Sequence, residues 1–222
     1  MSETPHSNNP VASLDSLAWE FSLLKHPFYR QWSAGELTFE RLRNYAAQYY
    51  RHVAAFPRYL SALHSRCDDL ATRQALLENL IEEEGGTENH PELWLRFAAA
   101  LGLGREDVLA AKPLPAAGAL VETFTHLTRE APLPAGLAAL YVYESQVAEV
   151  AAVKIDGLKR FYGIADEAGL KFFAVHREAD VHHARAIARL IERDSETAQD
   201  VPAMLDAGGA ALRAVWNLLD CV

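Results

Sequence analysis

The chain has 222 residues, half of them hydrophobic, so it is long enough to bury one sizeable core without disulfides. Its 21 basic and 30 acidic residues give a net charge of −9, and no basic cluster resembles a phosphate-binding stripe. Nucleic acid is therefore not expected as a partner. The chain has only two cysteines, Cys67 and Cys221, and they lie far apart in the sequence, which fits a reducing compartment.

The first ten residues, MSETPHSNNP, lack a basic region followed by an apolar run, so no signal peptide is expected. No stretch of about 18 continuous apolar residues occurs, so no transmembrane helix is predicted. These features predict a cytoplasmic protein that does not bind membranes.

Residues 1–11 are polar and are expected to form a disordered tail. From residue 12 onward the chain reads as successive helices, because strand-like alternation is nearly absent and Gly and Pro cluster at a few breaks. The expected helices cover about 13–24, 38–65, 69–83, 91–100, 106–111, 116–128, 135–162, 167–193 and 201–219. Residues 12–222 are therefore predicted to form one all-α bundle of about seven main helices.

The segment FFAVHREADVHHARA carries three metal-type ligands, His176, Asp180 and His183. A helix turns about 100° per residue, so positions four and seven residues after His176 return to nearly the same face. The flanking Arg177 and Arg185 allow an exposed polar stripe instead. Neighbouring apolar residues, among them Phe172, favour burial and metal binding.

Glu83 and His90 lie seven residues apart in LIEEEGGTENHPELW, with Gly85-Gly86 between them. They can meet if the chain turns at the glycines, so that Glu83 ends one helix and His90 begins the next. Several other acids surround them, and a solvated charge run remains the alternative interpretation.

Glu144 is a further candidate, because it occurs in the very apolar segment LAALYVYESQVAEV. Helical spacing places its carboxylate on a buried stripe, where it is costly unless paired with a cation or bound to metal. A salt bridge remains the alternative. Together, three histidines and three carboxylates are a plausible ligand set for two non-haem iron or manganese ions and predict oxygen chemistry, although a single-metal site stays open.

Lys154 continues an apolar stripe of the same predicted helix as Glu144. Such a lysine either extends its amine to solvent or is buried, in which case its pKa falls and the neutral amine becomes a nucleophile. Eight tyrosines are also present, and each fits ordinary core packing. Tyr143 adjoins Glu144, and a phenol beside an oxygen-activating metal can be oxidised.

Four motifs together resemble one known family: YLSALHSRCDDL, the E-x6-H pair Glu83/His90, YESQ, and the HxxxDxxH motif from His176 to His183. They are similar to those of the CADD-like proteins, within the haem-oxygenase-like di-metal oxidases. The resemblance covers about residues 15–195.

The resemblance implies that the protein makes p-aminobenzoate for folate biosynthesis, using O2, an external electron donor and two metal ions, Fe/Fe or Fe/Mn. The ring would come from Tyr29 and the amine from Lys154, so each chain would react once. Tyr45 and Tyr143 match further tyrosines near the family's metal site. The family has a tyrosine where this chain has Phe172, so a radical relay through that position is not expected.

Two other classes stay open. One is a PqqC-type oxidase or TenA-type hydrolase that acts on an external small molecule, with Cys67 as the candidate nucleophile for TenA-type chemistry. The other is a non-enzymatic protein-binding module. An exposed helix stripe would bind a partner protein or form a homodimer, and a homodimer is expected.

Overall fold

The structure is a computed structural model that describes residues 9–194 and 200–222, except for the side chains of residues 178–182 and 194. Its described part is helical, with no strand. The elements are α1 (Pro10–Glu20), the 3₁₀-helix η1 (Leu23–Lys25), α2 (Pro27–Ala34), α3 (Phe39–Arg66), α4 (Leu70–Glu84), α5 (His90–Ala100), α6 (Arg105–Ala110), α7 (Pro115–Arg129), α8 (Leu133–Phe161), α9 (Glu167–Asp194) and α10 (Asp200–Cys221). The predicted all-α class is confirmed, but the helices of the described part exceed the expected seven because several are short.

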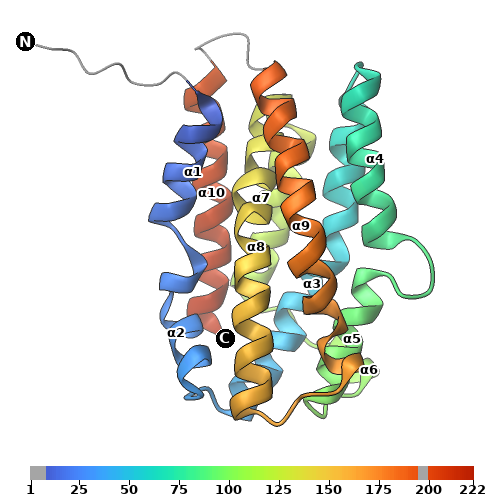
Figure 1. Cartoon of the computed structure of the whole chain (residues 1–222), viewed down its shortest axis with the longest axis vertical. Coiled ribbons are helices and arrows are strands. Elements are labelled where there is room, and N and C mark those ends of the chain that lie inside the picture. Colours follow the sequence, from blue (N-terminus) through green and yellow to red (C-terminus); the bar gives the residue numbers. More distant parts are fainter. Residues whose placement is uncertain (1–8, 195–199) are drawn as a thin grey trace, which may run out of the picture.

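The long helices run roughly along one axis, and α2, α5 and α6 gather at one end of the bundle (Figure 1). Helix α8 is the central element, since its most extensive contacts are with α9 on one side and α10 on the other. Helix α4 lies at the outer edge, where it packs mainly on α3 (Figure 1). The candidate ligands of α4, α5, α8 and α9 therefore come from neighbouring elements.

The N-terminal boundary differs from the expectation. Asn9 caps α1, because its side-chain oxygen accepts hydrogen bonds from the amides of Val11 and Ala12, at 2.9 and 3.2 Å. The helix thus begins at Pro10, three residues before the predicted start. Pro10 and Val11 therefore belong to α1 and not to the tail predicted for residues 1–11. Residues 1–8 lie outside the described part of the chain.

Helix α2 was not predicted, although it carries Tyr29. His26 caps it through Nδ1, which accepts a hydrogen bond from the amide of Phe28 at 3.0 Å, and Pro27 occupies the first helical position. Gly35, with φ of +70°, ends the helix in the left-handed conformation that favours glycine. The element is only two turns long, too short for its apolar spacing to reveal it.

Helices α3 and α4 begin as their sequences predict. Thr38 caps α3 by accepting a hydrogen bond from the Arg41 amide at 3.2 Å, and Asp69 caps α4 by accepting one from the Thr72 amide at 2.7 Å. These caps fix where the two long inward faces start. The face of α3 buries Tyr45, Tyr49 and other aromatic side chains against the centre of the bundle.

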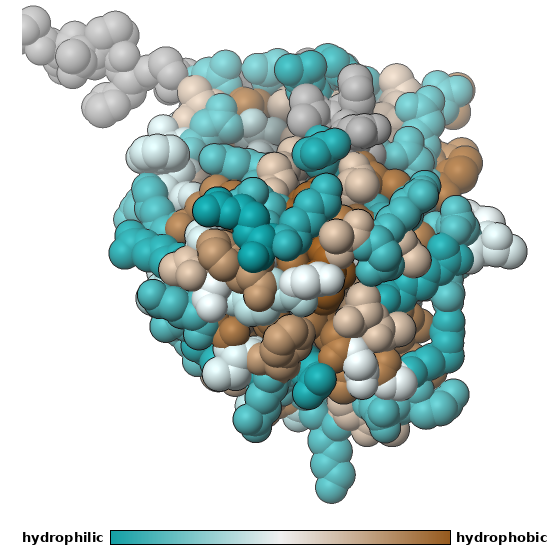
Figure 2. All heavy atoms as spheres, turned by 60° about the horizontal axis from the view of Figure 1, so that its bottom comes forward, coloured by the Kyte–Doolittle hydropathy of each residue, from teal (hydrophilic) through white to brown (hydrophobic). Residues whose placement is uncertain are grey.

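At the end of the bundle where α2, α5 and α6 lie, hydrophilic and hydrophobic side chains are mixed on the surface (Figure 2). No helix in the described residues is long and apolar enough to cross a membrane.

Candidate functional site

The turn at Gly85-Gly86 brings Glu83 and His90 together, as the sequence predicted. Glu83 lies in the last turn of α4, Gly86 adopts a φ of +69°, and His90 is the first residue of α5. His90 Nδ1 lies 2.8 Å from Glu83 Oε2, and both side chains are buried. The alternative of a solvated charge run is therefore wrong for this pair.

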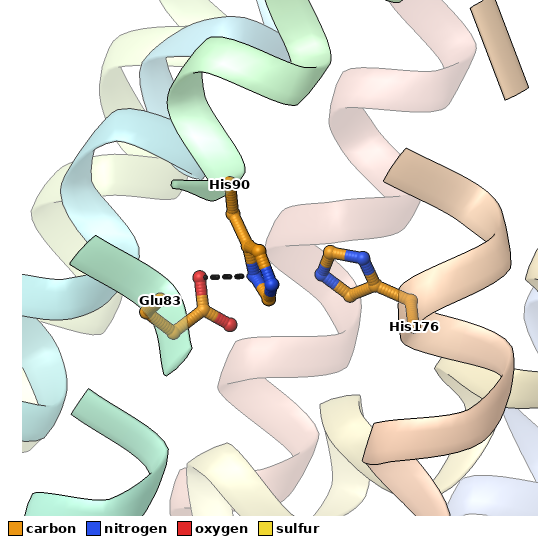
Figure 3. Close-up of side chains that lie close together, drawn as sticks. All are labelled: Glu83, His90 and His176. Carbon is orange, nitrogen blue, oxygen red and sulfur yellow. Dashed lines mark ion pairs between the residues drawn. The ribbon is translucent and has the colours of Figure 1, made fainter. Parts of the chain in front are cut away.

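His176 of α9 points toward the same pair from the opposite side (Figure 3). Its Nδ1 lies 2.6 Å from the carbonyl oxygen of Phe172, one turn earlier in α9. A hydrogen bond from Nδ1–H to this carbonyl leaves Nε2 as the lone-pair nitrogen, which is the usual arrangement of a metal-binding histidine. Burial, and then the charge of His90, hold the pKa of His176 well below its usual range.

Glu83, His90 and His176 together can hold a metal ion. Each offers one potential ligand atom, and these atoms lie within 4.8 Å of one another. Two imidazoles and one carboxylate are donors that suit iron, manganese or zinc. The three side chains are buried, so a bound cation would offset the cost of the enclosed carboxylate.

Glu144 of α8 is buried and lines one small cavity together with Glu83 and His176. Asn79 of α4 donates a hydrogen bond from Nδ2 to Glu144 Oε1 at 3.0 Å. The carboxylate therefore faces the same space as Glu83 and His176, on the buried stripe that the sequence predicted.

The remaining two predicted ligands have different outcomes. His183 is buried, but its Nε2 lies 3.0 Å from Oε2 of the half-exposed Glu82, and it is not grouped with His90 and His176. It lines a groove of about 660 Å³ between α4 and α9. The side chain of Asp180 lies outside the described part of the structure.

Lys154 is buried in the C-terminal third of α8, so its amine does not extend to solvent. Its Nζ donates a hydrogen bond to Tyr45 Oη at 2.7 Å and lies 5.4 Å from the ring centroid of Tyr29. The rings of Tyr49, Trp94 and Phe173 are also within 6 Å. Burial lowers the pKa of Lys154 from 10.5 to about 7, so a large share of the amine is neutral near neutral pH.

The side chains of Tyr29 and Tyr45 are buried, and their hydroxyls are protonated. Burial is the main cause that raises the pKa of each hydroxyl above its usual value of 10, and the two hydroxyls also hydrogen bond to each other. Lys154, Tyr45 and Tyr29 therefore form a connected polar group inside an aromatic core. We call Tyr29, Tyr45, Tyr49 and Lys154 the lysine cluster.

Two small cavities, each of about 20 Å³, lie between the metal-type ligands and the lysine cluster. They share the lining residues Tyr143, Val147, Phe172 and His176. The metal-side cavity also contacts His52, Val53, Phe56, Glu83 and Glu144. The lysine-side cavity also contacts Leu23, Tyr29, Tyr49, Val150, Ala151, Lys154 and Phe173. Each has room for little more than a water-sized molecule.

Tyrosines connect the two cavities. The hydroxyls of Tyr143 and Tyr49 lie 2.7 Å apart, and the ring centroids of Tyr49 and Tyr45 lie 5.2 Å apart. Phe172 packs on His176, with ring centroids 4.1 Å apart, and has no hydroxyl to join this network. The connection from the metal side to Lys154 thus runs through the hydroxyl contact of Tyr143 with Tyr49, the ring contact of Tyr49 with Tyr45, and the hydrogen bond from Lys154 to Tyr45.

Sequence reasoning missed Asn79 and Trp94, and it did not place His52 in the wall of the metal-side cavity. Asn79 had a usable signal, because the buried residues Thr72, Leu76, Asn79 and Glu83 have helical spacing on α4. Trp94 lies one turn after His90 and packs against Tyr49 and Phe172, which only the folded structure reveals.

Helical bundles build metal sites from inward-facing carboxylates and histidines, the residue types grouped here in Glu83, His90 and His176. Residues 43–216 match the family described as iron-containing redox enzymes, and the chain belongs to this family. A solved structure of a TenA homologue from Pseudomonas syringae superposes with a TM-score of 0.83 at 17% identity, covering 99% of this chain and 96% of that one. At that identity the likeness concerns the fold.

Two curated relatives are much more similar in sequence. The 4-aminobenzoate synthase of Chlamydia muridarum is 45% identical over 214 residues, covering 96% of this chain and 90% of the relative. The 4-aminobenzoate synthase of Nitrosomonas europaea is 44% identical over 223 residues, covering 96% and 91%. The resemblance to the CADD-like proteins, drawn from four motifs, is confirmed.

Proposed function

We propose that the protein forms p-aminobenzoate from its own Tyr29 and Lys154, in one turnover per chain. The names of the two relatives support the product. The observation that carries the proposal is the position of the Lys154 amine, which is buried, partly neutral, and 5.4 Å from the ring of Tyr29. A nucleophilic nitrogen and an oxidisable ring thus lie side by side beside metal-type ligands.

The size of the cavities supports an internal rather than an external ring. Two spaces of about 20 Å³ can admit O2 or water but not a free aromatic acid. The ring of Tyr29 already lines the lysine-side cavity. An external substrate would require the buried aromatic side chains around Lys154 to separate.

The structure of the product defines the bonds that must change. In p-aminobenzoate an amino group stands where tyrosine has its hydroxyl, and a carboxyl carbon stands where tyrosine has Cβ. The Tyr29 Cα–Cβ bond, the Tyr29 ring C–O bond and the Lys154 Cε–Nζ bond therefore break. Nζ bonds to the ring carbon as the phenolic oxygen leaves as water, and O2 is the oxidant that takes Cβ to the carboxyl level and leaves Cα and Cε bonded to oxygen. Neutral Lys154 supplies the electron pair for that bond, while Tyr45 holds Nζ in place through the 2.7 Å hydrogen bond.

Six side chains would hold two metal ions, Fe/Fe or Fe/Mn: Glu83, His90 and His176, with Glu144, Asp180 and His183. O2 activation, with electrons from an external donor, is the chemistry that such ions supply when bound. The buried carboxylates and the Nε2 of His176 fit this role. Asn79 orients Glu144 through its side-chain amide.

Oxidation of Tyr29 is proposed to proceed through Tyr143, Tyr49 and Tyr45. The 2.7 Å contact between the hydroxyls of Tyr143 and Tyr49 supports this route, and so does the 5.2 Å spacing of the Tyr49 and Tyr45 rings. Phe172 cannot lose a phenolic proton, so the tyrosines would serve instead of that position.

The test uses protein grown with ring-labelled tyrosine and nitrogen-labelled lysine. The purified chain is loaded with iron, with or without manganese, and given reductant and O2 but no organic substrate. We expect p-aminobenzoate that carries both labels, at no more than one per chain, and a mass loss that maps to Tyr29. Lys154→Ala should abolish the product, whereas the exposed Lys159→Ala on the same helix should not.

The external-substrate enzyme is the second candidate. Unlabelled product, or many turnovers of an added small molecule, would favour it over the internal reaction. TenA-type chemistry through Cys67 is not supported, because its buried thiol donates to the carbonyl of Leu63 at 3.1 Å and lines neither cavity. The homodimer and the cytoplasmic location stay predictions, as does the protein-binding module.

A further inference from the structure

His52 of α3 is a buried histidine that is not one of the six metal-type ligands. Its side chain is 1% exposed. Aromatic rings surround it, with centroids between 4.9 and 5.9 Å from its own: Tyr49, Phe56, Tyr59, Phe124 and Tyr143. Burial lowers the pKa of His52 to about 3, so the imidazole is neutral and carries one N–H donor and one acceptor nitrogen.

Neither ring nitrogen of His52 has a hydrogen-bond partner among the described residues. The hydroxyl of Tyr59, whose ring packs on His52, has none either. A buried polar group without a partner costs about 1–3 kcal/mol, and most such groups in folded proteins are paired with protein or with ordered water. An aromatic residue in place of His52 would fill the same core without that cost.

The position of His52 identifies what it can pair with. It lines the metal-side cavity together with Glu83, Glu144 and His176, and most of the other lining residues are apolar. Glu83, Glu144 and His176 would hold metal in this cavity of about 20 Å³, so only a small ligand bound to that metal would lie against His52. His52 therefore presents a hydrogen-bonding ring to the space that a small ligand of the metal centre would enter.

We propose that His52 is a positioning residue that hydrogen bonds to a diatomic ligand of the O2 type held in the metal-side cavity. The inference rests on metal binding in the proposed function but not on the fate of Tyr29. His52 acts from α3, whereas the metal-type ligands come from α4, α5, α8 and α9. It thus approaches the cavity from a different wall.

The test uses nitric oxide as the diatomic probe on the iron-loaded protein. Infrared spectroscopy measures the N–O stretching frequency, stopped flow measures the rate of release, and elemental analysis measures iron content. His52→Phe keeps the aromatic packing and removes the hydrogen bond. We expect it to shift the N–O stretch and to speed release about tenfold, as a lost hydrogen bond of moderate strength does, with iron content unchanged.

Two further variants control the result. His52→Gln keeps a side-chain N–H donor and should restore release to within about threefold of the wild-type rate. His64→Phe changes another histidine of α3 that does not line the cavity, and should leave both readouts unchanged.

An unchanged N–O stretch and release rate in His52→Phe would overturn the proposal, and so would a wild-type protein that binds no nitric oxide. A fall in iron content would overturn it too, because His52 would then be a metal ligand. Failure to detect p-aminobenzoate, with the nitric oxide signal still sensitive to His52, would count against the proposed function alone.

Discussion

The Nζ of Lys154 donates a hydrogen bond to the hydroxyl of Tyr45 at 2.7 Å, and this is the lysine's polar contact within an otherwise aromatic surround. A charged ammonium in this position has little solvation, which is why burial lowers its pKa to about 7. The arrangement favours a neutral amine and destabilises the folded protein whenever that amine is protonated. Reactivity and stability are therefore linked at this residue.

Lys154→Met should stabilise the protein, and more so at low pH. The folded-state pKa lies below the unfolded value of 10.5, so the unfolded chain binds the extra proton between about pH 7 and 10.5 and stability rises with pH across that window. The cost of Lys154 is therefore largest below about pH 7. We expect the gain in unfolding free energy to be about 3 kcal/mol larger at pH 6.5 than at pH 9.5.

Urea unfolding of the metal-free protein at the two pH values measures this difference. Lys159→Met is the matched control, because Lys159 is exposed on the same helix and its replacement should change stability equally at both pH values. A Lys154→Met gain that does not vary with pH would mean that the buried lysine keeps its ordinary pKa.

Tyr143→Phe should slow the formation of p-aminobenzoate. The substitution removes the hydroxyl that lies 2.7 Å from that of Tyr49 and leaves the ring in the cavity wall. We expect a fall in the single-turnover rate on the order of tenfold, equivalent to about 1.4 kcal/mol of barrier. Rapid quenching with chromatographic detection of the product measures the rate.

Tyr141→Phe is the control for that experiment. Tyr141 precedes Tyr143 by two residues on α8, but its hydroxyl donates to Asp15 of α1 at 2.5 Å and it lines neither cavity. It should lose about 1 kcal/mol of stability with the hydrogen bond, at an unchanged rate. Equal slowing by both variants would argue against a route through Tyr143.

The grouping of Glu83, His90 and His176 could be predicted because each of these residues lies within a local pattern. Glu83 and His90 flank two glycines that allow a turn, and His176 stands on an inward helical stripe. A helix boundary and a helical period are encoded by neighbouring residues, so no knowledge of the packing was needed.

The lysine cluster could not be assembled in this way. Tyr29 reaches Lys154, more than 100 residues later in the chain, only because α2 packs on α8. Helix α2 is also too short to be recognised from its periodicity. The family resemblance singled out Tyr29, whereas His52 stayed unassigned because nothing in its local sequence distinguishes a core histidine from a functional one.

Gly86→Ala should weaken metal retention. Gly86 has a φ of +69° in the turn that joins Glu83 to His90, and an added Cβ would meet no neighbour. The penalty is therefore the left-handed backbone alone, about 1 kcal/mol, and relaxation of the turn would displace His90 from Glu83. Competition with a chromophoric chelator measures the affinity for iron.

Gly163→Ala controls for the backbone penalty, since Gly163 has a φ of +68° and equally open surroundings but no candidate ligand nearby in the sequence. Both variants should lose similar stability without metal, and only Gly86→Ala should release iron more readily. Equal iron affinity in the two proteins would mean that the glycine turn does not set the Glu83–His90 geometry.

Metal binding should stabilise the fold through Glu83. A ligand that binds only the folded state, at about one hundred times its Kd, adds about 2.7 kcal/mol, which for a chain of this size corresponds to roughly 5–10 °C in Tm. Differential scanning calorimetry with and without Fe²⁺ or Mn²⁺ under anaerobic conditions measures the shift.

Glu83→Gln should abolish most of this metal-dependent Tm shift, because the buried carboxylate is one of the three grouped ligands. Glu84→Gln, at the exposed neighbouring position, should keep the full shift. A shift retained in Glu83→Gln would place the stabilising metal elsewhere in the protein.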